Sequence, residues 1–206
     1  RGEYGQLIMW DRQVGGMGED CLSLNVWTTS TDRAAKKAVV VSFHGGGFST
    51  GSGNAPGFDG KNLAYYGDVV VVTVNHRLAS FGYTNLVGAG APEAFKYAGV
   101  CGMLDLVASL EWVKANIENF GGDPGRVMIF GQSGGGAKTS TVLAMPPGRG
   151  LFHRAAIQSG AALRLVTPEA GAATAEKLVK QLGLSKSNIA GMQKLSWEKI
   201  LEAAGA

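Results

Sequence analysis

Residues 126–136 read Arg126-Val127-Met128-Ile129-Phe130-Gly131-Gln132-Ser133-Gly134-Gly135-Gly136. The first five are mostly apolar and predict a short buried strand, and the segment 136–145 is compatible with a helix. A turn between strand and helix forces Ser133 into a strained backbone conformation. Side chains at positions 131 and 135 would collide across this turn, and glycine at both positions relieves the clash. The pattern therefore predicts a serine hydroxyl exposed at the carboxyl end of a strand.

The composition indicates a globular chain of ordinary domain size. The chain has 206 residues, of which 45% are hydrophobic and 17% charged, and its formal net charge is +3. Lysine and arginine are scattered, so no basic stripe argues for a nucleic acid partner. The longest apolar runs, such as 38–41 and 69–72, are far too short to span a bilayer. These features exclude the disordered and nucleic-acid-binding classes and predict one domain with a sizeable core.

Strand and helix patterns alternate along the chain. The segments 38–43 and 69–74 are β-branched runs typical of strands buried on both faces, and 103–118 has apolar residues at helical spacing. Residues 121–125 predict a turn before the strand that precedes Ser133. The further expected elements are strands at 21–27 and 155–158 and helices at 168–182 and 197–203. This order predicts an α/β fold with a mostly parallel central sheet flanked by helices.

A second glycine-rich segment, His44-Gly45-Gly46-Gly47-Phe48, directly follows the predicted strand 38–43. Consecutive glycines let the main chain approach a ligand without side-chain obstruction. Backbone N–H groups aimed at the oxyanion of a tetrahedral intermediate stabilise it by roughly 3 kcal/mol each. A loop of this type, joined by the N–H of the residue after the serine, supplies such donors. The two segments together predict acyl-transfer chemistry, whereas for the glycine run alone a flexible turn is the less favoured alternative.

The chain resembles the type B carboxylesterases, a family with the α/β-hydrolase fold that includes cholinesterases and bacterial p-nitrobenzyl esterases. The resemblance covers about residues 15–165 in the order typical of the family. Gln132 and the glycines after Ser133 are more similar to the bacterial p-nitrobenzyl esterase type than to the cholinesterases, which usually show Gly-Glu-Ser-Ala-Gly-Gly. The segments that carry the resemblance are Glu19–Val26, His44–Phe48, Val72–Leu78, Gly102–Asp105, Phe120–Pro124, Phe130–Gly136 and Gly150–Arg154.

The resemblance implies a role for several residues. Ser133 would be the nucleophile that accepts the acyl group, and Gly46, Gly47 and Gly134 would form the oxyanion hole. Ser159 matches a serine that in this family supports the catalytic carboxylate. The implied substrate is a small-molecule carboxylic ester, with no cofactor, metal or nucleic acid, and the catalytic fold would be a single domain.

The chain offers no complete set of catalytic partners for Ser133. In this fold a carboxylate and then a histidine follow the serine along the chain. Of the three histidines, His44 and His76 precede Ser133, and no Asp or Glu lies between Ser133 and His153. We therefore expect residues 1–206 to be the N-terminal portion of a longer catalytic domain, inactive without the rest. The alternative is a non-catalytic, cholinesterase-like interaction module.

Other conspicuous residues have structural interpretations. Arg77 and Asp105 are expected to form a buried ion pair or hydrogen-bond anchor, and Asp123 is expected to lie in a turn. Cys21 and Cys101 read as small buried residues, with a disulfide between them as the less favoured alternative. The four tryptophans, which are expected to pack in the core or at its edge, are Trp10, Trp27, Trp112 and Trp197.

Overall fold

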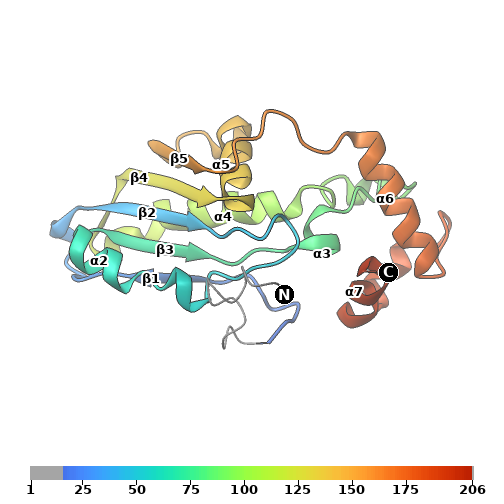
Figure 1. Ribbon diagram of the computed structural model, residues 1–206, viewed down its shortest axis with the longest axis horizontal. Helices are drawn as coiled ribbons and strands as arrows, with labels where there is room; N and C mark the ends of the chain where they lie inside the picture. Colours follow the sequence, from blue (N-terminus) through green and yellow to red (C-terminus); the bar gives the residue numbers. More distant parts are fainter. Residues whose placement is uncertain (1–15, 206) are drawn as a thin grey trace.

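The computed structural model describes residues 16–205, which form a central sheet with helices on both faces and at one end (Figure 1). The five strands lie in the order β1-β3-β2-β4-β5, and β1 alone runs antiparallel to its neighbour. This arrangement confirms the predicted, mostly parallel α/β sheet. The strands are β1 (Leu24–Trp27), β2 (Lys37–Phe43), β3 (Val70–Val74), β4 (Gly122–Gln132) and β5 (Arg154–Gln158).

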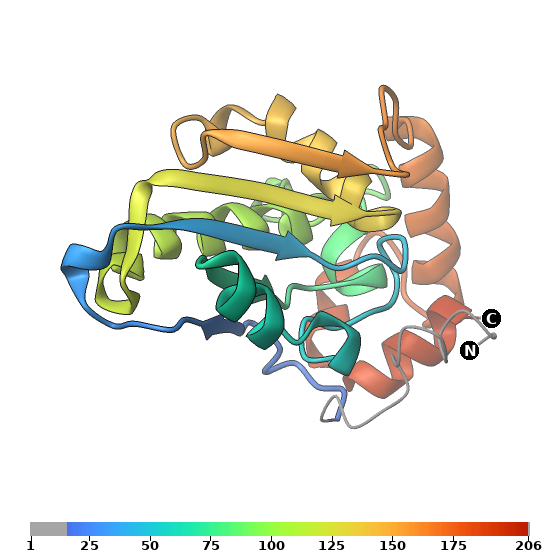
Figure 2. The same ribbon diagram turned by 60° about the vertical axis from the view of Figure 1, so that its left-hand side comes forward.

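The helices form two groups, one that covers the two faces of the sheet and one that lies at its end. In Figure 2, α2 lies on one face of the sheet and α4 and α5 lie on the other, while α6 and α7 stand beyond the carboxyl ends of the parallel strands. The last two helices therefore occupy the end of the sheet at which Ser133 lies. The α-helices are α2 (Lys61–Gly67), α3 (Ala79–Tyr83), α4 (Cys101–Asn116), α5 (Gly134–Ala144), α6 (Pro168–Gln181) and α7 (Trp197–Gly205).

Two hydrophobic clusters hold these elements together. The first joins the buried faces of β2, β3 and β4 to α4, and every residue of β3 is buried because helices cover both faces of the sheet. The second lies between α6, α7 and the segment 86–98, with Ala175 and Ile189 at its centre. Burial of apolar area at about 25 cal/mol per Å² makes both clusters substantial sources of stability.

The structure corrects several expected boundaries. The turn expected at 121–125 is the irregular start of β4, where Gly122 pairs with Lys37 and the register then shifts. Asp123 still accepts a hydrogen bond from the Gly125 N–H at 2.8 Å, as in a turn. The helix expected from 136 begins at Gly134. Helices α2 and α3 were not predicted, because a helix of five to seven residues shows no full period of apolar positions.

The structural interpretation of Arg77 and Asp105 is confirmed. The Arg77 side chain donates to the Asp105 carboxylate from Nε at 2.9 Å and from NH2 at 2.6 Å, and the Arg77 backbone N–H donates to it at 3.0 Å. This contact joins the segment after β3 to α4.

The remaining structural predictions have mixed outcomes. Cys21 and Cys101 are both free, so the disulfide alternative is wrong. Trp112 packs against Phe120 as expected, whereas Trp10 lies outside the described residues. Within residues 16–205, no helix has both the length and the apolar character required to cross a bilayer.

Candidate active site

Ser133 lies in a sharp turn between β4 and α5. Its backbone angles are φ 56° and ψ −122°, a conformation that residues with a side chain rarely adopt. The neighbouring strand secures this geometry, because the Ser133 N–H donates to the Gln158 carbonyl at 2.8 Å. The Ser133 carbonyl in turn accepts from the Ala137 N–H at 3.0 Å, which starts the helix. The side chain is therefore presented at the carboxyl end of the sheet and is only half-buried.

The glycines around Ser133 are required by close backbone contacts. A Cβ added at Gly131 would overlap the backbone of Gly135, and one added at Gly135 would overlap the carbonyl oxygen of Phe43. The collision expected across the turn is therefore present in the structure. Glycine at these positions lets β2, β4 and α5 meet at van der Waals distance.

The segment after β2 folds into a tight loop that faces the turn. Gly46 and Gly47 have φ values of 88° and 64°, which favour glycine. The Gly46 carbonyl accepts from the Thr50 N–H at 3.1 Å and from the Ser49 N–H at 3.3 Å. The Phe48 carbonyl accepts from the Ala79 N–H at 2.7 Å, which fixes the loop to α3.

The loop and the turn meet at Gly47 and Gly134. A Cβ added at Gly134 would lie 2.5 Å from both the nitrogen and the Cα of Gly47, and one at Gly45 would lie 3.7 Å from the Ser133 Cβ. Among the described residues, no acceptor takes a hydrogen bond from the N–H of Gly46, Gly47 or Gly134. Gly45 and Gly47 of the loop thus lie against Ser133 and Gly134.

Two buried histidines lie under the loop. The rings of His44 and His76 are 4.9 Å apart between centroids. His44 Nδ1 lies 2.8 Å from the Gly45 carbonyl oxygen, while its Nε2 and both nitrogens of His76 have no partner among the described residues. Burial, followed by the charge of Lys138, lowers the pKa of His44 to about 3 and that of His76 to about 2. Both imidazoles are therefore neutral at physiological pH.

No histidine of the described chain is bonded to Ser133. His153 lies at the amino end of β5, where its Nδ1 accepts from the Val127 N–H at 3.2 Å. Ser133 follows the opposite end of the adjacent strand, in which Gln132 pairs with Gln158. Five to six residues of strand at about 3.3 Å each separate the two side chains along the sheet. His153 is therefore too far from Ser133 to act as its base.

Ser159 lies directly after β5, next to the turn. Its φ of 49° lies in the left-handed region, and its preceding residue, Gln158, accepts the Ser133 N–H. The following residue is equally close, because a Cβ at Gly160 would overlap the Ser133 carbonyl oxygen. The structure therefore brings Ser159 to the same edge of the sheet as Ser133.

Sequence analysis did not single out Lys138, which is fully buried in α5. Its Nζ donates to the His44 carbonyl at 3.0 Å and lies 5.6 Å from the centre of the Phe48 ring. Burial lowers the pKa of Lys138 to about 7. The sequence feature that could have indicated Lys138 is its charge, since the rest of the helix is built from small and apolar residues.

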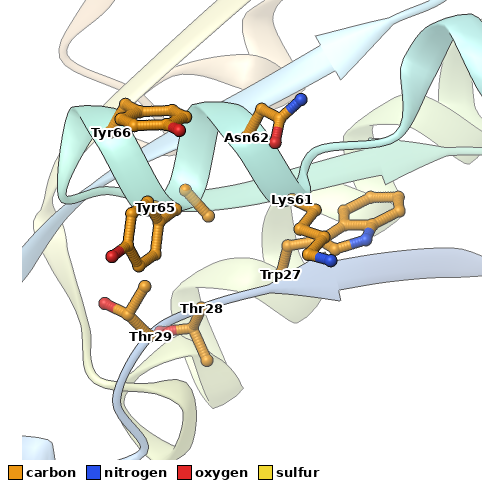
Figure 3. A pocket seen from close by; sticks show the side chains of 8 residues that line it. Trp27, Thr28, Thr29, Lys61, Asn62, Tyr65 and Tyr66 are labelled. Atoms are coloured by element: carbon orange, nitrogen blue, oxygen red, sulfur yellow. The ribbon is translucent and has the colours of Figure 1, made fainter.

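Two surface hollows of the described residues lie away from Ser133. One, of about 420 Å³, lies between β1 and α2, where Trp27, Lys61 and Tyr65 line it together with the more exposed Tyr66 (Figure 3). A second, also of about 420 Å³, lies at the amino ends of β4 and β5 near His153. Within residues 16–205, no three His, Cys, Asp or Glu side chains are grouped so that they could hold a metal ion.

The fold and the serine turn define an α/β-hydrolase. A model of the carboxylesterase family matches residues 4–206, and the chain belongs to that family. The para-nitrobenzyl esterase of Bacillus subtilis (strain 168) is 41% identical over 186 residues, which is 90% of this chain and 37% of that protein. Acetylcholinesterase-1 of Trittame loki is 41% identical over 163 residues, or 78% of this chain and 28% of that protein.

Solved structures give the same result. The Geobacillus stearothermophilus carboxylesterase EST55 at pH 6.2 superposes with a TM-score of 0.89 at 41% identity, over 94% of this chain and 40% of that one. An esterase from anaerobic Clostridium hathewayi, described as able to hydrolyse aliphatic aromatic polyesters, gives 0.86 at 42% identity, over 98% of this chain and 41% of that one. The chain thus spans about two fifths of the length of these relatives.

Proposed function

We propose that the protein is a serine carboxylesterase that hydrolyses small-molecule carboxylic esters through an acyl-enzyme. The observation that carries this proposal is the convergence of Ser133 with three free N–H groups, those of Gly46, Gly47 and Gly134. Membership of the carboxylesterase family supports the same reaction class. The names of the similar proteins include para-nitrobenzyl esterase and acetylcholinesterase, both of which act on esters.

The arrangement of these groups supports the following reaction. The Ser133 oxygen attacks the ester carbonyl carbon, and the carbonyl oxygen takes up negative charge that the three N–H groups would stabilise. The alcohol then leaves, and the acyl group remains on Ser133. Water attacks this acyl-enzyme, and the acid is released. In both halves of the reaction a base must take a proton from the attacking oxygen and return it to the leaving group.

We propose that the base and its carboxylate lie outside these residues. His44 and His76 are buried and have strongly lowered pKa values, and His153 lies at the other end of the strands. Residues 1–206 would then be the N-terminal portion of a single catalytic domain, and Ser159 would support the carboxylate from beside the turn. The reading frame after Ala206 tests this: it should encode an Asp or Glu and later a histidine in a Gly-x-x-His context.

Labelling with a fluorophosphonate probe, together with hydrolysis of an activated aryl ester, tests the nucleophile. The intact protein should react with both reagents, whereas Ser133→Ala should lose both and the matched control Ser187→Ala, at an exposed serine, should keep them. The 206-residue chain alone should turn over no ester, because Ser133 lacks a base. An intact protein that reacts with neither reagent would favour the non-catalytic interaction module instead.

A further inference from the structure

The most unusual group outside the proposed catalytic machinery is the side chain of Lys138. It is one of the largest fully buried side chains, and no carboxylate of the described residues forms an ion pair with it. An unpaired buried charge is costly, and lysine is almost never fully buried without a partner. A residue that lowers stability in this way is expected to contribute to function instead.

The surroundings of Lys138 connect the two halves of the site. Lys138 lies in the second turn of α5, whose first residue follows Ser133, and its Nζ donates at 3.0 Å to the carbonyl of His44. That carbonyl belongs to the residue immediately before Gly45, Gly46 and Gly47. The ammonium also lies 5.6 Å from the ring centre of Phe48, at the other end of the glycine run. A single side chain thus contacts both ends of the loop.

We propose, on the basis of the proposed function, that Lys138 positions the segment 44–48, which we call the oxyanion loop. Its hydrogen bond to the His44 carbonyl holds this loop so that the N–H groups of Gly46 and Gly47 face Ser133. The glycines themselves cannot provide this rigidity, since they have the greatest backbone freedom of all residues. A buried hydrogen bond from a charged donor is stronger than one from a neutral donor, so it restricts the loop more than a neutral contact would.

Among residues 16–205, the titratable groups that interact with the charge of Lys138 are neutral. They are His44 at the end of β2 and His76 beyond β3, and both imidazoles are neutral. The hydrogen bond to the His44 carbonyl is therefore strongest when Lys138 is protonated, which its pKa of about 7 allows near and below neutral pH.

The variant Lys138→Met in the intact protein tests the proposal. Methionine keeps the length of the side chain but removes both donor and charge. At pH 6 we expect kcat for an activated aryl ester to fall about tenfold with KM unchanged, because misaligned oxyanion donors weaken binding of the transition state alone. The ratio of wild-type to variant kcat should shrink toward pH 9, where Lys138 is neutral. Amide hydrogen exchange should accelerate at Ser49 and Thr50, whose N–H groups donate to the Gly46 carbonyl.

The matched control is Lys114→Met, since Lys114 also donates to a backbone carbonyl, that of Gly150, but is exposed on α4. This variant should change neither kcat nor the amide hydrogen exchange of the loop after β2. Three results would overturn the proposal: an unchanged kcat, unchanged exchange at Ser49 and Thr50, or exchange accelerated equally throughout the core. Hydrogen exchange needs no turnover, so it tests Lys138 even if the wild-type protein fails to hydrolyse esters, a failure that would count against the proposed function alone.

Discussion

Ser133 has a backbone conformation that the glycines around it make possible. The strain at a non-glycine residue with positive φ costs of order 1–3 kcal/mol and persists only where surrounding contacts enforce it. Here those contacts are the hydrogen bond to Gln158 and the close approach of Gly131 to Gly135. The serine hydroxyl is presented by backbone geometry, and the glycines are needed for packing and do no chemistry themselves.

Gly135→Ala should therefore lower the free energy of unfolding by about 3 kcal/mol, since its Cβ would overlap the Phe43 carbonyl oxygen. The control Gly191→Ala places its Cβ 3.7 Å from the Leu184 side chain and should change stability by no more than about 0.5 kcal/mol. Urea unfolding measures both values. Equal stability of the two variants would contradict the close packing of β2 against α5.

The lowered pKa of Lys138 predicts that the free energy of unfolding depends on pH. Its pKa is about 7 in the folded protein and 10.5 ordinarily, so between these values the unfolded chain holds a proton that the folded protein has released. The free energy of unfolding should therefore rise with pH in this window, by up to about 1.4 kcal/mol per pH unit. Lys138→Met should lose this slope and be the more stable protein at pH 7.

Unfolding measured between about pH 7 and pH 8.5 isolates this effect. Below this window the lowered pKa values of His44 and His76 cause stability to fall as pH falls, because the unfolded chain then takes up protons that the folded protein excludes. Above it the raised pKa values of Cys21, Cys101 and Tyr83 cause stability to fall as pH rises. Equal slopes in wild type and Lys138→Met would show that Lys138 is not buried as described.

The strands and helices are joined at the site by a few specific contacts. The pair of Arg77 and Asp105 connects the end of β3 to α4, and the Asp105 carboxylate accepts three hydrogen bonds. One face of this pair is open, since the Arg77 side chain is 40% exposed while that of Asp105 is 6% exposed. The contact therefore stabilises less than a fully buried pair would.

Asp105→Asn should destabilise the protein by about 2 kcal/mol, since it leaves charged and backbone donors without a full set of acceptors. Glu118→Gln is the control, because Glu118 pairs with Arg33 and Lys36 on the open surface and its loss should have no measurable effect. Thermal unfolding of both variants checks the difference. A Tm of Asp105→Asn equal to that of Glu118→Gln would contradict the anchoring role.

The sheet as a whole has an uncovered side in residues 16–205. Strand β5 is an edge strand with mostly exposed residues, and the segment after it, which crosses to α6 in Figure 1, exposes Leu163, Leu165 and Val166. Leu163 and Val166 are 102% and 76% exposed. Exposed strand edges and contiguous apolar surface favour association between chains.

The purified 206-residue chain should therefore self-associate and bind the dye ANS. Replacing Leu163 and Val166 together by serine should reduce both effects, whereas Tyr66→Ser, at a similarly exposed position within α2, should not. Light scattering after size-exclusion chromatography provides the measurement. A monomeric chain without ANS binding would show that this surface is covered in solution.

Local patterns sufficed for much of the fold and for the backbone geometry around Ser133. The apolar runs at 38–43 and 69–74 and the helical spacing at 103–118 predicted β2, β3 and α4, because periodicity is a local property of the chain. The glycine spacing around Ser133 likewise predicted the strained turn. The short helices α2 and α3 escaped prediction, since a helix of five to seven residues shows no full period of apolar positions.

The backbone geometry of Ser133 and of the glycines in both loops was predictable from the sequence, because backbone strain and close approach leave few residue types possible at those positions. The catalytic roles of these residues stay predictions. Three features were not predictable from the sequence. They are the contact of Gly47 with Gly134, the burial of Lys138 beneath the loop, and the distance of His153 from Ser133. These three features depend on strand order and register, which bring together residues far apart in the chain. No local pattern encodes this pairing of strands, because it depends on which apolar faces of strands and helices are buried against each other when the sheet assembles.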